Sequence, residues 1–283
     1  MLRRSISETK ATVCATLGIF AGWAFTALCQ PLPQELLRPA NVRGIPDRAA
    51  AEDPPDRPDI YTLDFSFKPP RTIEVDIPRR GRRIVWYLWY QVSNDTGQPR
   101  EFRPQFRWVV ITPGREGAYT DEVLPYVVDK IQEIEDPQRV YPIHTSISIA
   151  KVKIPHVQQF DPLGRRIAFP EYVTGVATWS VATPDEIKTL AKQPEYVRNY
   201  LPPDMSNFYI YVFGLSNGFV LIDTPEGKPM TKNKALRLKF QRRGDEFRQH
   251  ANQIEYLGYD WIYTHPDTPI PPNKPAGLVA PAP

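Results

Sequence analysis

Ser216 is the residue whose surroundings most resemble a catalytic motif. Residues 214–218 read Gly-Leu-Ser-Asn-Gly, the pattern that carries the nucleophile of α/β-hydrolases. There a strand precedes the serine, and a helix follows it and helps to bind the oxyanion. Here the serine is followed by Phe-Val-Leu-Ile-Asp, a strand pattern, and Asn-Gly is typical of a hairpin turn. We therefore predict a turn at Ser216, and a serine hydrolase is the weakest of three functional hypotheses.

The histidines and acidic clusters predict no metal site and no cofactor. No two histidines have His-x-His or His-x-x-x-His spacing, and no His-Glu-x-x-His is present. The clusters at 121–122 and 133–136 lack the alternation and the glycine of a calcium-binding loop. No glycine-rich phosphate loop or dinucleotide fingerprint is present either. We expect surface or turn positions for the four histidines, which are His144, His156, His250 and His265.

Two aromatic residues are the candidate binding residues. The strongest strand pattern, over residues 83–93, places Trp86, Leu88 and Tyr90 on one face and Tyr87 and Trp89 on the other. If the first face fills the core, Tyr87 and Trp89 point away from it. Either they form an exposed platform for sugar rings or a partner protein, or a helix or second layer covers them.

The remaining patterns predict a chain composed mostly of strands. Period-two alternation between turn signals predicts strands at 61–67, 72–77, 83–93, 102–112, 145–154, 172–181, 207–213, 219–223, 235–241 and 254–263. We expect one hairpin between 83–93 and 102–112, across the turn at 94–97. We expect a second between 207–213 and 219–223.

Only two short segments have helical spacing. Residues 183–186, Thr-Pro-Asp-Glu, match a capping box with proline as the first helical residue. Apolar residues in 127–136 also recur at helical intervals. The fold class predicted is mainly β: an antiparallel β-sandwich, Ig-like or related, with one or two short inserted helices. Two small β modules divided near Pro170 are the alternative.

Composition narrows the classes of partner. The net charge of +3 comes mostly from the first 29 residues, because without Arg3, Arg4, Lys10 and Glu8 there remain 32 basic and 31 acidic residues. A nearly neutral body lacks the broad positive field of a nucleic-acid-binding protein. Both cysteines precede residue 30, so the body can form no disulfide and no thiolate zinc site.

The ends of the chain predict export. Arginines followed by an uncharged apolar run over 11–30 are typical of a secretory signal, and the run is also long enough to be an uncleaved membrane anchor. Either outcome places the body in the periplasm, the cell envelope or the extracellular space. We expect residues 1–29 to be this leader, 30–59 a proline-rich linker, 60–263 the β-sandwich and 264–283 a proline-rich disordered tail.

Part of the sequence resembles exported proteins of unknown function from planctomycete-type bacteria. The resemblance covers 234–263, including Gln-Arg-Arg-Gly-Asp-Glu-Phe at 241–247 and Gly-Tyr-Asp-Trp-Ile-Tyr at 258–263. It extends to Tyr-Val-Phe-Gly-Leu-Ser-Asn-Gly-Phe at 211–219. It implies an envelope location and a β body. It implies no activity and no functional residue.

Three functional hypotheses follow. The leading one is an exported, non-enzymatic envelope protein that acts as a structural or protein-interaction β-sandwich. The second is a carbohydrate-binding module that uses Tyr87 and Trp89, and the third is the hydrolase at Ser216. The expected partner is an envelope protein or a polysaccharide, with association at a membrane if the leader is retained and no binding of nucleic acid. The sequence gives no indication of self-assembly.

Overall fold

A computed structural model describes residues 59–113, 116–156, 171–190, 200–203, 205–223, 227–242 and 254–267. All of them belong to one compact unit, Glu35–Pro283. The predicted leader, nearly all of the linker and most of the tail lie outside the described residues. Within those ranges, no helix combines the length and the apolar character needed to cross a membrane.

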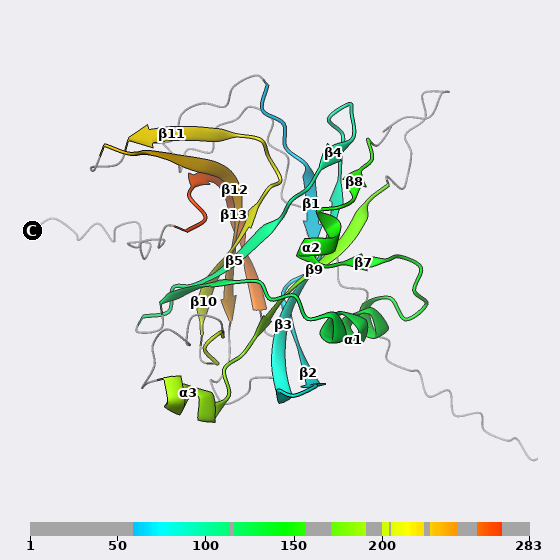
Figure 1. The fold of residues 1–283 in the computed structure, drawn as a ribbon, viewed down its shortest axis with the longest axis vertical. Coiled ribbons are helices and arrows are strands. Elements are labelled where there is room, and N and C mark those ends of the chain that lie inside the picture. Colours follow the sequence, from blue (N-terminus) through cyan, green and yellow to red (C-terminus); the bar gives the residue numbers. More distant parts are fainter. Residues whose placement is uncertain are drawn as a thin grey trace, which may run out of the picture. The chain divides into compact units, whose positions relative to one another are not determined.

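The first sheet has five strands arranged around β3 (Gly81–Ser93). β1 (Asp64–Phe67) and β2 (Arg71–Ile77) pair with successive parts of β3. β9 (Val173–Ser180) also pairs with β3, and the short β7 (Ile143–His144) runs parallel to β9 (Figure 1). All pairings except that of β7 are antiparallel, as predicted.

The second sheet has six strands. They are β5 (Gln105–Val110), β6 (Gly117–Thr120), β10 (Asn207–Phe213), β11 (Phe219–Asp223), β12 (Pro229–Arg242) and β13 (Ile254–Thr264). The order is β11-β12-β10-β5-β6, with β13 also paired to β12. Two further strands, β4 (Arg100–Glu101) and β8 (Lys153–Ile154), pair with each other.

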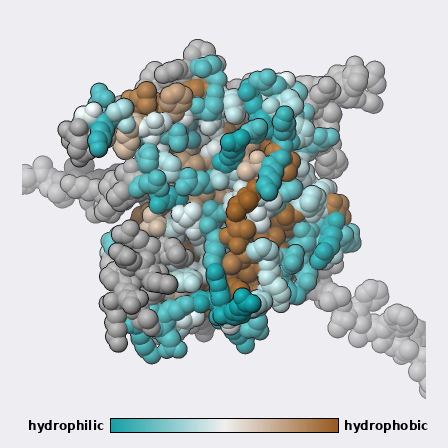
Figure 2. Space-filling model, viewed as in Figure 1, coloured by the Kyte–Doolittle hydropathy of each residue, from teal (hydrophilic) through white to brown (hydrophobic). Residues whose placement is uncertain are grey.

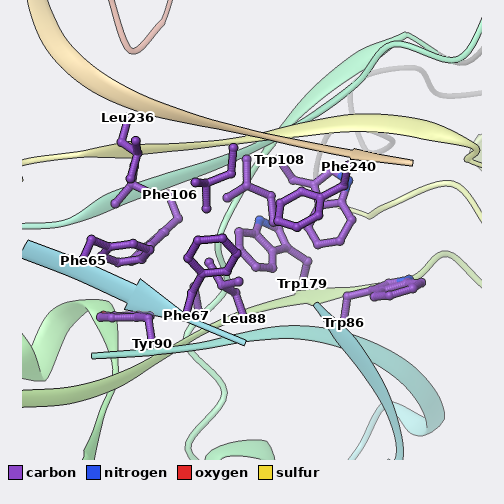
Figure 3. Packing of buried hydrophobic residues seen from close by; sticks show 14 of the residues in the cluster. Phe65, Phe67, Trp86, Leu88, Tyr90, Phe106, Trp108, Trp179, Leu236 and Phe240 are labelled. Atoms are coloured by element: carbon purple, nitrogen blue, oxygen red, sulfur yellow. The ribbon is translucent and has the colours of Figure 1, made fainter. Parts of the chain in front are cut away.

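The two larger sheets share one aromatic core, so the fold is the predicted β-sandwich. Trp86 and Trp179 of the first sheet meet Trp108 of the second, with ring centroids 5.6 and 5.1 Å apart (Figure 3). Alternation along each strand produces this arrangement, because every second side chain projects to the same face. Burying so many large rings removes much apolar area from water, which is the main favourable term in folding.

The predicted hairpin between 83–93 and 102–112 is wrong, although both strands exist. β3 and β5 lie in different sheets, and Tyr90 meets Phe106 across the core with ring centroids 5.0 Å apart. The connection from 94 to 104 includes β4 and is much longer than a tight turn. The apolar residues of the two strands alternate in the same way because both strands face the same core.

The predicted hairpin between 207–213 and 219–223 is also wrong. β10 and β11 do not pair with each other; both pair with β12, β10 at 236–241 and β11 at 229–233. The long β12 therefore forms the hairpin with β11, across a connection that contains Gly227 at positive φ. The length of β12 could not be read from the shorter alternating pattern at 235–241.

Both predicted helices are confirmed: α1 (Pro125–Glu135) and α3 (Pro184–Leu190). The capping box is present, because the Glu186 amide donates to Thr183 Oγ1 at 3.3 Å and the Thr183 amide donates to Glu186 Oε2 at 2.9 Å. The strand predicted at 145–154 is wrong for most of its length. Thr145 caps the short helix α2 (Ser146–Ile149), and only β8 remains extended.

Helix α1 covers part of the outer face of the first sheet. Val127 and Ile131 are fully buried against Tyr87 of β3 and Val176 of β9. Each large sheet contains strands from both sides of Pro170 in the chain. In the first sheet β3 pairs with β9, and in the second β5 pairs with β10. A division of the chain near Pro170 would therefore cut both sheets.

Candidate functional site

Tyr87, one of the two expected platform residues, lies beneath helix α1. Its side chain is only 3% exposed, and its hydroxyl donates to Glu135 Oε1 at 2.8 Å. Burial and the adjacent carboxylate raise the pKa of Tyr87 well above its ordinary value, so the phenol is neutral. Tyr87 thus matches the covered alternative, and its ring cannot stack against a ligand.

Glu135, at the C-terminus of α1, is a buried carboxylate that two cations surround. Lys68 Nζ lies 2.6 Å and Arg71 Nη1 3.0 Å from its oxygens. A buried carboxylate at the negative end of a helix dipole is costly unless it is paired, and these contacts supply the pairing. The cluster of Lys68, Arg71 and Glu135 carries a net positive charge, and its two cations remain partly exposed.

Trp89, the second expected platform residue, is partly exposed and packs against the buried cluster that includes Val127 and Ile131 of α1. The ammonium of Lys68 lies 4.4 Å from the centroid of its ring, within range of a cation–π interaction. The backbone of Lys68 also donates to the Trp89 carbonyl at 3.0 Å. The ring is therefore held in place between Lys68 and the sheet, with part of its surface facing solvent.

Two tyrosines lie near the C-terminal end of α1. The rings of Tyr141 and Tyr172 are 5.4 Å apart, and Tyr141 is 47% exposed. The backbone of Tyr141 is fixed to α1, since its amide donates to Asp136 Oδ2 at 2.8 Å and its carbonyl accepts from Gln132 Nε2 at 3.1 Å. Desolvation and a hydrogen bond with Tyr141 raise the pKa of Tyr172. Both rings are thus positioned by strong local contacts.

Aliphatic side chains extend this surface. Ile134, in the last turn of α1, is 54% exposed, and Val140, next to Tyr141, is 59% exposed. Figure 2 shows hydrophobic surface, in brown, over the region where Figure 1 labels α2, β7 and α1. We call the set of Trp89, Ile134, Val140, Tyr141 and Tyr172 the α1-edge surface. Exposed apolar residues that gather near one element mark binding sites more often than single exposed ones.

Ser216 lies in an extended segment and not at the start of a helix. Its hydroxyl donates to the Tyr61 carbonyl at 2.6 Å and accepts from the Gly218 amide at 3.1 Å. The next element is strand β11, so the strand–turn–helix geometry of a nucleophile elbow is missing. The hydroxyl links the chain at Tyr61 to the second sheet.

The described histidines have separate structural surroundings. His156 Nδ1 accepts from the Gly97 amide at 3.1 Å, and His265 Nδ1 accepts from the Asp267 amide at 3.0 Å. Burial lowers the pKa of His144, which lies in β7. His250 falls outside the described residues. Within the described ranges, no three His, Cys, Asp or Glu side chains group closely enough to hold a metal ion.

Among the residues of the α1-edge surface, only Trp89 was predicted from the sequence as a binding residue. Tyr141 and Val140 follow the helix in a segment without periodicity, and Tyr172 precedes β9. Nothing local indicates that these residues meet, because β9 reaches the sheet from a distant part of the chain. Comparison of the chain with family models, with curated proteins and with solved structures found no match.

Proposed function

We propose that this protein is an exported, non-enzymatic envelope protein whose β-sandwich binds another envelope protein through the α1-edge surface. The observation that carries the proposal is the exposure, around the C-terminal half of α1, of the Tyr141–Tyr172 ring pair, of Trp89, and of the aliphatic residues Ile134 and Val140. Rings already fixed by packing lose little conformational freedom when a partner covers them, which favours binding.

A protein partner fits this surface better than a sugar does. The exposed aliphatic side chains of Ile134 and Val140 offer apolar area but no hydrogen bonds, and a polysaccharide needs many hydrogen bonds. The partly exposed cations Lys68 and Arg71 provide a polar rim, as is usual around an apolar interface centre.

Carbohydrate binding remains the second candidate because of Trp89. The indole is partly exposed, so its uncovered part can contact a sugar, and Lys68, which lies over the ring, can donate to hydroxyl groups. Since Tyr87 is buried, such a site would use Trp89 with Tyr141 or Tyr172 in place of the expected Tyr87–Trp89 pair.

The protein-binding proposal is tested by crosslinking the exported protein in intact cells and identifying the partner, followed by measurement of its affinity for the purified chain. Ile134→Ser and Tyr141→Ala should each weaken this binding at least about tenfold. Leu257→Ala, which truncates a similarly exposed apolar residue on β13, is the matched control and should bind normally. Equal affinity of all three variants would reject the α1-edge surface as the interface.

Affinity electrophoresis in purified envelope polysaccharide separates the second candidate from the first. Retardation of the wild-type chain that Trp89→Ala abolishes and Ile134→Ser preserves would favour the carbohydrate module. The hydrolase hypothesis has its own test, in which Ser216→Ala is compared with wild type for ester hydrolysis. Hydrolysis that the wild type performs and Ser216→Ala loses would contradict a non-enzymatic role.

Export is tested by protease treatment of intact cells that carry the full chain. We expect the body to be digested or found outside the cytoplasm. Substitution of Arg3 and Arg4 by Glu should retain it inside, because the positive start of a leader sets its orientation. Cytoplasmic retention of the wild-type chain would contradict the proposal.

A further inference from the structure

A row of polar side chains crosses the outer face of the second sheet. Directly paired residues of adjacent strands place their side chains on the same face. The row contains one such residue from each of β6, β5, β10, β12 and β13, in that order: Thr120, Arg107, Tyr211, Arg237 and Asp260. Phe106 and Trp108, the neighbours of Arg107 along β5, face the core, so the row lies on the opposite face.

Asp260 pairs the cations at the β13 end of this row. Arg237 Nε donates to Asp260 Oδ1 at 2.7 Å, and Arg237 Nη2 donates to Oδ2. Lys239 Nζ lies 3.0 Å from the same Oδ2. Burial of Asp260 opposes its ionisation, but the hydrogen bond with Arg237 outweighs burial and lowers its pKa. The charges at this end of the row are therefore paired within the protein.

Arg107 and Tyr211, by contrast, carry buried donors that are not used. The Nε and Nη1 atoms of Arg107 are buried and form no hydrogen bond, and no acidic side chain in the described ranges pairs with its guanidinium. The hydroxyl of the fully buried Tyr211 forms no hydrogen bond either. Burial raises the pKa of Tyr211 to about 12 although Arg237 opposes the shift, so the phenol is protonated and can donate. Buried donors without acceptors cost free energy, which a bound acceptor would recover.

Apolar side chains lie around these donors, and solvent reaches them from the β6 side. Buried residues of the same face form an outer cluster: Val109, Tyr209, Tyr211, Phe213 and Ala235. Ala118 of β6 is partly exposed and packs against this cluster. Thr120 is exposed on β6, the end strand of the sheet, and Arg107 beside it is partly exposed. The unpaired guanidinium therefore lies between solvent and an apolar surface.

We propose that Arg107 and Tyr211 bind the carboxylate of a small organic ligand whose apolar part lies over Ala118. A planar carboxylate accepts two parallel hydrogen bonds from a guanidinium, and the phenol supplies a further donor. Arg107 is a single unpaired cation in apolar surroundings, which matches one negative charge attached to an apolar group. This site is on the second sheet and uses no residue of the α1-edge surface, so it is independent of the proposed protein binding.

Benzoate is the probe, because it joins a carboxylate to a flat apolar group. Isothermal titration calorimetry of the purified full chain should give a Kd of about 1 mM or lower. Arg107→Gln should weaken binding at least about tenfold, and Tyr211→Phe, which removes one donor, at least about threefold. Arg103→Gln is the matched control and should bind normally, because Arg103 is 76% exposed and pairs with the exposed Glu101.

Two further probes test the class of ligand. Benzyl alcohol keeps the apolar ring without the charge, and inorganic phosphate keeps a charge without the ring. Each should bind at least about tenfold more weakly than benzoate. The proposal is overturned if benzoate does not bind, if Arg107→Gln binds it as tightly as wild type does, or if either of the other probes binds as tightly as benzoate.

Stability without ligand separates a binding role of Arg107 from a structural one. Arg107→Met removes the unsatisfied donors and keeps an apolar stem, so the urea midpoint should stay unchanged or rise. Arg237→Met leaves Asp260 buried without its main partner, so the midpoint should fall. A fall with Arg107→Met as large as that with Arg237→Met would mean that Arg107 is paired within the folded chain, and the proposed site would be wrong.

Discussion

Glu135 and Glu186 show how the burial of a carboxylate is balanced by its ion-pair and hydrogen-bond partners. Glu135 is almost completely buried, and Lys68, Arg71 and the Tyr87 hydroxyl all contact it. Glu186 is more exposed, and it caps α3 while it pairs with the buried Arg83. The consequence of removing each carboxylate depends on how much solvent can replace it.

Replacing Glu135 with Gln should destabilise the protein by about 3 kcal/mol. This is the low end of the range for breaking a buried ion pair, because Lys68 and Arg71 keep some contact with water. Tyr87→Phe, which removes only one hydrogen bond to the same carboxylate, should cost about 1 kcal/mol. Urea denaturation measures both values, and a Glu135→Gln protein as stable as wild type would contradict the structural role of this cluster.

Glu186 should make stability depend on acid pH. Hydrogen bonding to Arg83 lowers the pKa of Glu186 from an ordinary 4.5 to about 2, although partial burial opposes the shift. A lowered folded-state pKa means that the pair stabilises the protein above pH 4.5. That contribution declines as pH falls from about 4.5 to about 2.

The measurement is the difference in unfolding free energy between wild type and Glu186→Gln across that pH window. Because Glu186 is partly exposed, we expect a difference of about 1 kcal/mol or less at pH 7. It should shrink toward pH 2. A difference that stays constant with pH would contradict the pairing of Glu186 with Arg83.

At the scale of elements, helix α1 has two distinct faces. Val127 and Ile131 are fully buried on the outer face of the first sheet, while Ile134 is exposed in the last turn. The helix has no side-chain cap at its N-terminus and begins with a proline. An isolated helix of this length is marginal in water, so its position depends mainly on the buried face.

Ile131→Ala should therefore cost about 2–5 kcal/mol, because it leaves a cavity between α1 and the sheet. Ile134→Ala is the same chemical change in the same helix at an exposed position, and it should alter stability by no more than about 0.5 kcal/mol. Chemical denaturation of both variants checks this contrast. Similar losses from the two substitutions would mean that α1 packs by a different face.

At the scale of the whole molecule, the two large sheets bury one continuous aromatic core. Trp108 stacks on Phe208 within the second sheet and meets Trp179 of the first. Neither sheet can separate from the other without exposing these rings to water. The stability of each sheet is therefore coupled to that of the other.

We expect the described sandwich to unfold in one cooperative transition. Tryptophan fluorescence reports on the shared core and far-ultraviolet circular dichroism on the strands, and their denaturation midpoints should coincide. Trp179→Phe should lower both midpoints together. Two separate transitions would instead favour two β modules that unfold independently.

The local elements could be predicted from the sequence, because alternation and capping depend on residues that are neighbours in the chain. Nine of its ten predicted strand segments became strands over most of their cores, and Thr183 capped its helix as expected. The alternation over residues 83–93 also indicated Trp89 as a candidate binding residue. The strand predicted at 145–154 was wrong for most of its length, because Thr145 and Ser148 cap each other and favour a helical turn.

The pairing of the strands and the exposure of the aromatic rings could not be predicted from the sequence and became clear only from the folded structure. Period-two alternation gives the phase of a strand but not its partner, so β3 and β5 looked like a hairpin although they face each other across the core. Helix α1 buried Tyr87 and left Trp89 partly exposed, a distinction that depends on where a separate element packs. Long-range packing sets these outcomes, and no local pattern encodes it.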